Sequence, residues 1–219
     1  MGATIALRCP DGSEASGYLA EVDGARAGVV VIQEWWGLND QIKGVAERFA
    51  AAGFTALAPD LYDGRVTGEP DEANHLMTGL DWVGATEVEV QGALQYLKAR
   101  LERAAVMGFC MGGALTAIAA ARLADCDAAV CYYGIPPKEQ AEPADIRVPF
   151  QGHFANNDDW CTPGAVDAFE AALGSVDTAW EIHRYEAAHA FFNETVEAYD
   201  AQAAARSWQR TLAFLRAHL

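Results

Sequence analysis

The pattern of hydrophobic and polar positions changes its period along the chain, and each period predicts a different kind of element. Apolar and polar residues alternate in ATIALRC (3–9) and in SGYLAEV (16–22), on either side of a turn at 10–12, which predicts an antiparallel hairpin. The continuous apolar, β-branched run GVVVIQ (28–33) predicts a strand that is buried on both faces. The chain is therefore expected to begin with a hairpin that leads into a buried strand.

Helical and strand-like segments then alternate to the end of the chain. A helical period covers about 39–52, with Asn39 or Asp40 as its N-cap. Further strands are predicted at 55–59, 104–109, 127–134, 148–154 and 178–185, and further helices at 87–101, 111–123, 163–173 and 197–218. The polar, glycine-rich segment 60–82 is expected to be a loop or a short helix over the sheet's edge. Repeated strand–helix units predict an α/β fold in a single domain (1–219), with a mostly parallel sheet covered by helices on both faces.

Composition and charge narrow the function classes. The 219 residues are 52% hydrophobic, but no apolar run reaches the ~20 residues that span a bilayer, and the N-terminus lacks the features of a signal peptide. We therefore expect a cytoplasmic protein, either a monomer or a small homo-oligomer. The formal charge of −16 disfavours nucleic acid and anionic membrane as partners. Five irregularly spaced cysteines indicate neither a disulfide framework nor a structural metal.

The segment GFCMG (108–112) has the form G-x-C-x-G between a predicted strand and a predicted helix, which is typical of a nucleophile elbow. Glycines are needed there because the turn is tight and strained. The position places Cys110 at a helix N-terminus, whose positive end favours a thiolate. The backbone N–H of Met111 would point toward an oxyanion. The four serines of the chain occupy no such turn, so Cys110 is the predicted nucleophile, and a buried cysteine in a glycine-rich turn is the alternative.

A nucleophile of this kind needs a base and an acid, which follow it in that fold in the order nucleophile, acid, base. Asp158 and Asp159 come directly after a predicted strand, and the residues alone do not decide between them. His189 lies between small residues in the loop before the last helix, and His153, at the end of a strand, is its rival. The order Cys110, aspartate, His189 therefore satisfies the requirement for a catalytic triad.

Six motifs along nearly the whole chain resemble those of the dienelactone hydrolase family of α/β-hydrolases. They are QEWWG (33–37), APDLY (58–62), GFCMGG (108–113), YYG (132–134), NNDDW (156–160) and AHAFFN (188–193). The resemblance implies an α/β-hydrolase fold and cleavage of a small ester or lactone through an acyl-enzyme, with no metal and no organic cofactor. It implies Cys110 as nucleophile, His189 as base and Asp158 as acid, because the family's aspartate lies two residues before an aromatic residue. It also implies that Trp35 and Met111 supply the two N–H groups of the oxyanion hole.

The same resemblance gives a role to Glu34, which would contact the resting thiol and swing on substrate binding so that the thiolate forms. The residues themselves support a special environment, because an acid that directly follows an apolar strand is costly to bury without a partner. If Glu34 is buried beside Cys110, its pKa should rise and it could exchange a proton with the thiol. The alternative is a surface acid at the start of a loop.

The chain departs from the family where dienelactone-opening members hold the substrate carboxylate with two arginines. Asn193 stands at one of these positions, and no arginine occurs between Arg65 and Arg100, so Arg65 is either a substitute or a solvated loop charge. The side chains predicted to line the substrate pocket are Trp36, Tyr62, Arg65, Tyr133, Trp160, Phe191 and Asn193. Two alternatives stay open: a broad carboxylesterase or thioesterase for small apolar acyl groups, and a non-catalytic small-ligand binder or redox sensor on the same scaffold.

Overall fold

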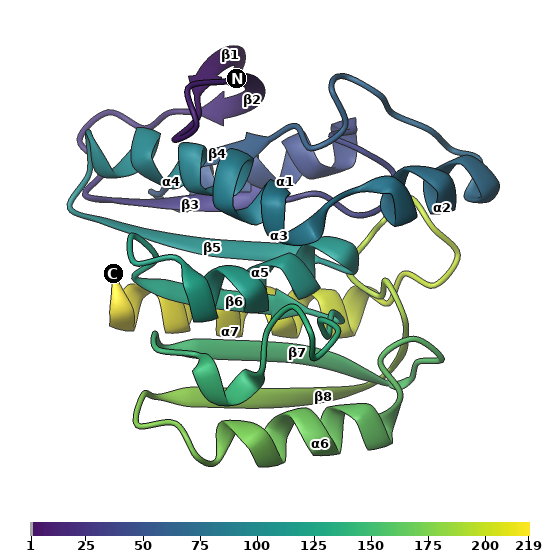
Figure 1. Ribbon diagram of the computed structural model, residues 1–219. Helices are drawn as coiled ribbons and strands as arrows, with labels where there is room; N and C mark the ends of the chain where they lie inside the picture. The colour runs from purple at the N-terminus through teal and green to yellow at the C-terminus, as the bar shows by residue number, and fades with distance from the viewer. Residues whose placement is uncertain (1) are drawn as a thin grey trace.

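The structure is a computed structural model that describes residues 2–219, and its strands form one sheet. The strands are β1 (Ala3–Arg8), β2 (Glu14–Ala20), β3 (Ala27–Ile32), β4 (Thr55–Pro59), β5 (Arg103–Phe109), β6 (Ala128–Tyr132), β7 (Phe150–Asn157) and β8 (Trp180–Ala188). Their order across the sheet is β1-β2-β4-β3-β5-β6-β7-β8 (Figure 1). β2 is antiparallel to both β1 and β4, and the pairings from β4 to β8 are parallel. The predicted hairpin and mostly parallel sheet are confirmed.

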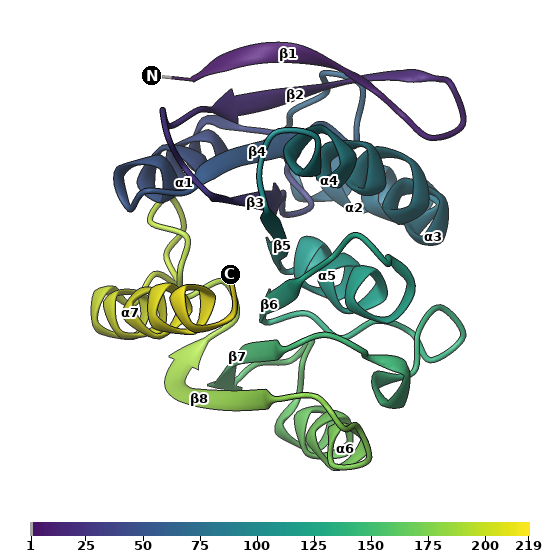
Figure 2. The same ribbon diagram turned by 90° about the vertical axis from the view of Figure 1, so that its left-hand side faces the viewer.

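Helices cover both faces of this sheet. They are α1 (Asp40–Ala51), α2 (Pro70–Gly79), α3 (Trp82–Ala85), α4 (Gln91–Lys98), α5 (Met111–Arg122), α6 (Pro163–Leu173) and α7 (Ala201–His218). Figure 2 shows α1 and α7 on one face of the sheet and α4, α5 and α6 on the other. Within residues 2–219, no helix has both the length and the apolar character that a membrane crossing requires.

The buried strand β3 contributes to the hydrophobic core on both sides. Val29 belongs to the buried cluster that contains Phe49 of α1 and Phe214 of α7. Val30 belongs to the other cluster, with Leu115 of α5. Successive side chains of a strand point to opposite faces, so a strand between two helical layers must be apolar at every position. This explains the continuous apolar run from which the strand was predicted.

The helical segment predicted at 87–101 begins earlier and is less regular than expected. It starts with α3, where Asp81 Oδ1 accepts a hydrogen bond from the N–H of Gly84 at 3.0 Å. It continues as a π-helical turn at Thr86–Val90 and ends with α4. The cap at Asp81 sets the true start, which the hydrophobic period alone did not locate. The preceding segment 60–82 contains the ten-residue helix α2.

The final helix was predicted to begin at 197 but begins at Ala201. The side chain of Asp200 accepts hydrogen bonds from the N–H groups of Gln202 at 2.9 Å and Ala203 at 2.8 Å, and it therefore defines the N-cap. As a result, the residues between β8 and α7 remain a loop. This loop reaches the edge of the sheet where β3, β5 and β7 also end, and there the candidate site lies.

Candidate active site

Cys110 occupies a strained turn between β5 and α5. Its φ of 55° and ψ of −117° lie in a region that residues other than glycine rarely adopt. A Cβ on Gly108 would lie 2.2 Å from the carbonyl oxygen of Gly112, and a Cβ on Gly112 would lie 2.5 Å from the carbonyl oxygen of Gln33. Both glycines are therefore required by the close approach of β5, α5 and the end of β3. The backbone around the thiol has the form of a nucleophile elbow.

His189 and Asp158 meet across the ends of the neighbouring strands β8 and β7. His189 Nδ1 lies 2.8 Å from Asp158 Oδ2. The other carboxylate oxygen, Oδ1, accepts hydrogen bonds from the N–H groups of Trp160 at 2.8 Å and Cys161 at 2.9 Å. An ionised carboxylate accepts only, so Nδ1 carries a hydrogen and Nε2 remains available for proton transfer. Asp159 is exposed, and the structure brings Asp158 rather than Asp159 to the imidazole ring.

The electrostatic environment favours a proton on His189. Burial alone would lower the pKa of His189, but the hydrogen bond to Asp158 and the nearby thiol of Cys110 raise it to about 10. Burial would raise the pKa of Asp158, but the hydrogen bonds from His189 and from two backbone N–H groups lower it. His189 Nε2 is buried and has no hydrogen-bond partner within residues 2–219. The ring of His189 therefore holds a proton more strongly than a free imidazole does, and its Nε2 is available to exchange one.

The rival histidine, His153, lies in the core of β7. Its Nδ1 is 2.8 Å from the hydroxyl of Tyr185, and its Nε2 is 2.9 Å from Gln151 Oε1 and 3.1 Å from the hydroxyl of Thr211. Because it is fully buried, its pKa falls well below the ordinary value of a histidine. His153 thus joins β7, β8 and α7 and does not line the hollows around Cys110.

Glu34, directly after β3, is buried and held by two side chains. Tyr133 donates from its hydroxyl to Oε1 at 3.1 Å, and Asn193 donates from Nδ2 to Oε2 at 2.7 Å. Burial raises the pKa of Glu34, and these two hydrogen bonds oppose the rise only in part. The alternative of a surface acid is wrong. Within the described residues, the carboxyl group of Glu34 makes hydrogen bonds to Tyr133 and Asn193 but none to the thiol of Cys110, with which the resemblance implies a contact.

Two backbone N–H groups beside the thiol lack acceptors. Met111 is the first residue of α5, where helix geometry leaves the N–H groups without intrahelical partners. Trp35 lies in the loop after β3 and lines the same hollow as Cys110. Within residues 2–219 we find no acceptor for the backbone N–H of either residue. Trp35 lies in the wall of the larger hollow beside Cys110, and Met111 lies in the wall of a smaller one.

Two hollows adjoin Cys110. The larger hollow has a volume of about 210 Å³ and is lined by Glu34, Trp35, Trp36, Cys110, Trp160, His189, Ala190, Val196 and Ala198. The smaller hollow has a volume of about 70 Å³ and is lined by Met77, Trp82, Cys110, Met111, Ala114, Tyr133, Gly134, Ile135, Trp160, Cys161 and His189. Within residues 2–219, no group of three or more histidine, cysteine, aspartate or glutamate side chains is placed to hold a metal ion.

Three of the predicted pocket side chains line these hollows. Trp36 lines the larger hollow, Tyr133 lines the smaller one, and Trp160 lines both. Sequence reasoning missed Val196 and Ile135, which also line them. Small apolar residues in loops carry no chemical pattern, so no sequence signal identified them.

The other four predicted pocket residues do not line either hollow beside Cys110, so the predicted pocket is corrected at these positions. They are Tyr62, Arg65, Phe191 and Asn193. Phe191 has no exposed surface and packs against Tyr133 at a ring distance of 5.3 Å. Asn193 is buried against Glu34. Tyr62 donates from its hydroxyl to the sulfur of Met111 at 3.2 Å, and together with Arg65 it lines a separate polar hollow. Arg65 therefore does not replace the missing arginines.

Comparison with known proteins places this geometry in context. Residues 15–219 match the dienelactone hydrolase family. A protein named usf from Aquifex pyrophilus is 33% identical over 95% of this chain and 96% of its own. A protein named "Putative carboxymethylenebutenolidase" from Aquifex aeolicus is 30% identical over the same shares of the two chains. A crystal structure named "Putative Dienelactone Hydrolase" from Klebsiella pneumoniae superposes with a TM-score of 0.85 and 25% identity, covering 98% of both chains.

Proposed function

Because the chain belongs to the dienelactone hydrolase family, we propose that it hydrolyses a small ester or lactone through a thioester formed on Cys110. The family and the α/β-hydrolase fold predicted from the sequence are confirmed. The presence of all strands in one sheet also supports a single domain over 1–219.

The first half of the reaction acylates the thiol. His189 Nε2 takes the proton from the Cys110 sulfur, and the thiolate attacks the carbonyl carbon of the substrate. The N–H groups of Met111 and Trp35 donate to the oxygen that becomes negative. The bond between this carbon and the alkoxy oxygen then breaks, and His189 gives its proton to the departing oxygen. Asp158 holds the ring in one tautomer throughout and balances its charge.

The second half of the reaction releases the acid. A water molecule gives a proton to His189 Nε2 and attacks the thioester carbonyl carbon. The carbon–sulfur bond breaks, and the thiol of Cys110 regains a proton from His189. One ester and one water molecule thus give one acid and one alcohol. For a lactone, both groups remain on one product molecule.

In this proposal, Glu34 contributes by remaining uncharged beside the nucleophile. Glu34 lines the larger hollow together with Cys110 and His189. Because burial raises its pKa, it can remain uncharged at a pH at which an exposed glutamate is ionised. An uncharged Glu34 adds no negative charge near Cys110 and therefore does not oppose formation of the thiolate.

A single observation carries the proposal: His189, fixed by Asp158 at 2.8 Å, keeps Nε2 unpaired beside a cysteine in a nucleophile elbow. The test is a panel of neutral and carboxylate-bearing esters and lactones with wild type and Cys110→Ala. We expect Cys110→Ala to lose at least about 1000-fold in kcat. Intact-protein mass spectrometry should show an acyl adduct on the wild type. Cys126→Ala, at a buried cysteine, is the matched control. It should keep the hydrolytic activity and still form the acyl adduct. Full activity of Cys110→Ala would refute the proposal.

A second candidate, a broad carboxylesterase or thioesterase for uncharged substrates, is favoured by one observation. Within residues 2–219, neither hollow is lined by a lysine or an arginine. The redox-sensor alternative has less support. It needs a second thiolate beside Cys110, and burial raises the pKa of Cys131 to about 12 and that of Cys161 still further.

A further inference from the structure

We propose that the substrates of this site are uncharged esters with two unequal arms, one as large as an aromatic ring and the other a short aliphatic group. The ring-sized arm occupies the larger hollow and the short arm the smaller hollow. This inference rests on the proposed function and deepens it by naming the substrate class.

The reactive groups lie where the two hollows meet. Cys110 and His189 line both of them, and so does Trp160. The ring of Trp160 lies 6.0 Å from that of His189 and 5.7 Å from that of Trp35, measured between centroids. An ester carbonyl at the sulfur of Cys110 therefore has one arm directed into each hollow.

The volumes of the hollows set the size of each arm. An apolar cavity of about 150 Å³ is large enough to hold benzene. The larger hollow, at about 210 Å³, exceeds this volume and can accept an aromatic ring, with Trp36 and Val196 in its wall. The smaller hollow, at about 70 Å³, has about half the volume of a cavity that holds benzene. It can therefore accept only a few carbon atoms, with Ile135 in its wall. A substrate with two rings does not fit.

The charges around the hollows exclude a carboxylate on either arm. Within residues 2–219, no lysine or arginine lines them. The charge of His189 is already balanced by Asp158. A substrate carboxylate would therefore lose its hydration without gaining a partner.

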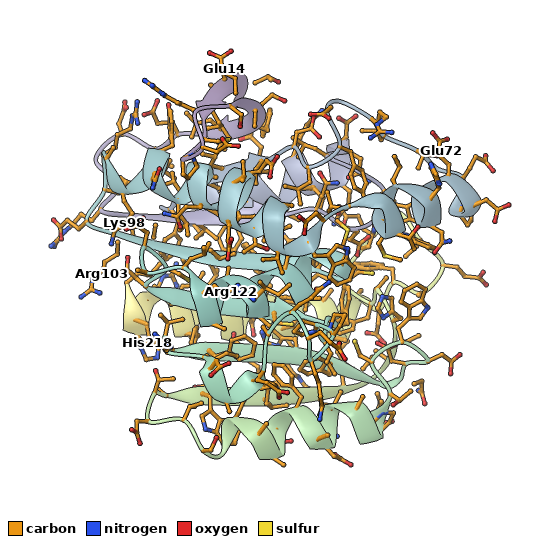
Figure 3. The ribbon with its side chains drawn as sticks, in the orientation of Figure 1. Glu14, Glu72, Lys98, Arg103, Arg122 and His218 are labelled. Carbon is orange, nitrogen blue, oxygen red and sulfur yellow. The ribbon has the colours of Figure 1, made fainter. Side chains whose placement is uncertain are left out.

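The cations of the chain lie elsewhere. Figure 3 shows Lys98 and Arg103 at the end of the molecule where β5 begins, opposite the end that carries Cys110. Both cations pair with Asp127, at 2.7 Å and 3.1 Å. Arg65 lines the separate hollow that also contains Glu89. None of these three is placed to meet a substrate anion at the thiol.

The size of the arms is tested with phenyl acetate, phenyl butanoate and phenyl benzoate, each rate being divided by the rate of hydroxide-catalysed hydrolysis. We expect kcat/KM to fall by about 100-fold from phenyl acetate to phenyl benzoate, because overfilling a packed site is costly. Ile135→Ala enlarges the smaller hollow and should recover about 10-fold of this loss for phenyl benzoate. Ile5→Ala, a half-buried isoleucine on β1, is the matched control and should recover none. Equal corrected rates in wild type would overturn the inference.

The charge of the arms is tested with 4-carboxyphenyl acetate and its uncharged isostere 4-carbamoylphenyl acetate. We expect kcat/KM for the carboxylate to be about 10-fold to 100-fold lower. Val196→Arg places a cation in the wall of the larger hollow and should reduce this gap in kcat/KM between the two substrates by about 10-fold. Val176→Arg, before β8 at the other end of the sheet, is the matched control and should leave the gap unchanged. A carboxylate that is hydrolysed as fast as its isostere would also overturn the inference.

The failure of this inference and that of the proposed function give different results. If phenyl acetate is hydrolysed with the same rate by wild type and Cys110→Ala, the proposed function fails. If the activity depends on Cys110 but discriminates neither size nor charge, the hydrolase stands and only the substrate class is wrong.

Discussion

Asn193 donates a hydrogen bond from Nδ2 to Glu34 Oε2 at 2.7 Å, and this contact joins residues that are 159 positions apart in the chain. It connects the loop after β3 to the loop after β8. Asn193 Oδ1 in turn accepts hydrogen bonds from the N–H and the hydroxyl of Thr195, at 2.9 Å and 2.6 Å. The asparagine is thus fixed on one side by its own loop and on the other side orients the buried acid. The resemblance to dienelactone-opening enzymes implies an arginine at this position, and asparagine supplies no positive charge there.

The first prediction concerns the pH dependence of stability caused by Glu34. In the folded chain its pKa lies above 4.5, so the folded state keeps a proton that the unfolded state has released. This contribution to stability is complete below pH 4.5 and is lost as the pH rises through the folded pKa. Glu34→Gln cannot titrate, so we expect it to gain stability relative to wild type between pH 4.5 and 8, measured by urea unfolding.

The matched control is Glu197→Gln, an exposed carboxyl in the loop after β8. Its exposed side chain controls for the substitution itself, so Glu197→Gln should stay within about 0.5 kcal/mol of wild type over the same pH range. If the Glu34→Gln difference is equally constant, the raised pKa of Glu34 is wrong.

The second prediction concerns the pair of Asp158 and His189. Asp158→Asn removes the charge that holds the pKa of His189 at about 10, so this pKa should fall toward 6.5. We expect kcat to drop by about 1000-fold to 10000-fold, as is usual when the acid of a triad is neutralised. The alkaline limb of kcat/KM against pH should move from near 10 to a lower value, since His189 must be protonated to release the alcohol. The exposed Asp159→Asn should change neither quantity.

The same pair makes a third prediction for stability, with the sign worked out from the folded and unfolded pKa of His189. The folded pKa is raised, so the contribution is complete below 6.5 and is lost as the pH rises to about 10. Wild type should therefore lose stability between pH 6.5 and 10 relative to His189→Gln, which has no imidazole. Parallel stability curves for the two proteins would contradict the raised pKa.

The fourth prediction concerns the elbow glycine Gly112. Its Cβ in Gly112→Ala would lie 2.5 Å from the carbonyl oxygen of Gln33 and 2.6 Å from that of Ile32, and backbone atoms cannot move aside easily. We expect a loss of about 3 kcal/mol in the free energy of unfolding, measured with urea. Gly44→Ala in α1 is the matched control, because nothing lies within 4 Å of its added Cβ. It should gain roughly 0.5–1 kcal/mol, since alanine is the better helix former.

The fifth prediction separates the two histidines that competed for the role of base. His153→Gln should destabilise the fold by roughly 2–4 kcal/mol, because it disrupts a buried network with Tyr185 and Thr211. The kcat of the protein that remains folded should change little. His189→Gln should lose most of its kcat, and it should also lose at neutral pH the pH-dependent stability that the raised pKa of His189 contributes. If His153→Gln is fully folded and still loses kcat, His153 rather than His189 would be the candidate for the catalytic base.

The arrangement of the sheet was predictable because its signals are local. Continuous apolar runs such as 28–33 occur where a strand must face two helical layers, as Val29 and Val30 do. Strand–helix alternation then places the residues after β5, β7 and β8 at one edge of the sheet. For this reason the positions of Cys110, Asp158 and His189 at that edge followed from order alone. The roles of these residues remain proposals.

The parts that sequence reasoning missed depend on contacts between distant segments. The start of α7 was placed four residues early because apolar periodicity extends past the cap at Asp200. The burial of Glu34 was one of two alternatives, since its partner Tyr133 lies 99 positions away. Val196 joins the site only because that cap keeps its segment in a loop. The proposed specificity thus depends on residues with no chemical signature, whereas the proposed reactivity depends on residues with a strong one.

The positive φ of Cys110 destabilises the folded chain at the residue that the proposed function makes the nucleophile. A non-glycine residue held at a φ of 55° is disfavoured by roughly 1–3 kcal/mol, and glycine would relieve most of this strain. We therefore expect Cys110→Gly to be more stable than wild type and, under the proposed function, to lose its activity. The packing of the rest of the chain must therefore offset the strain of the backbone at Cys110.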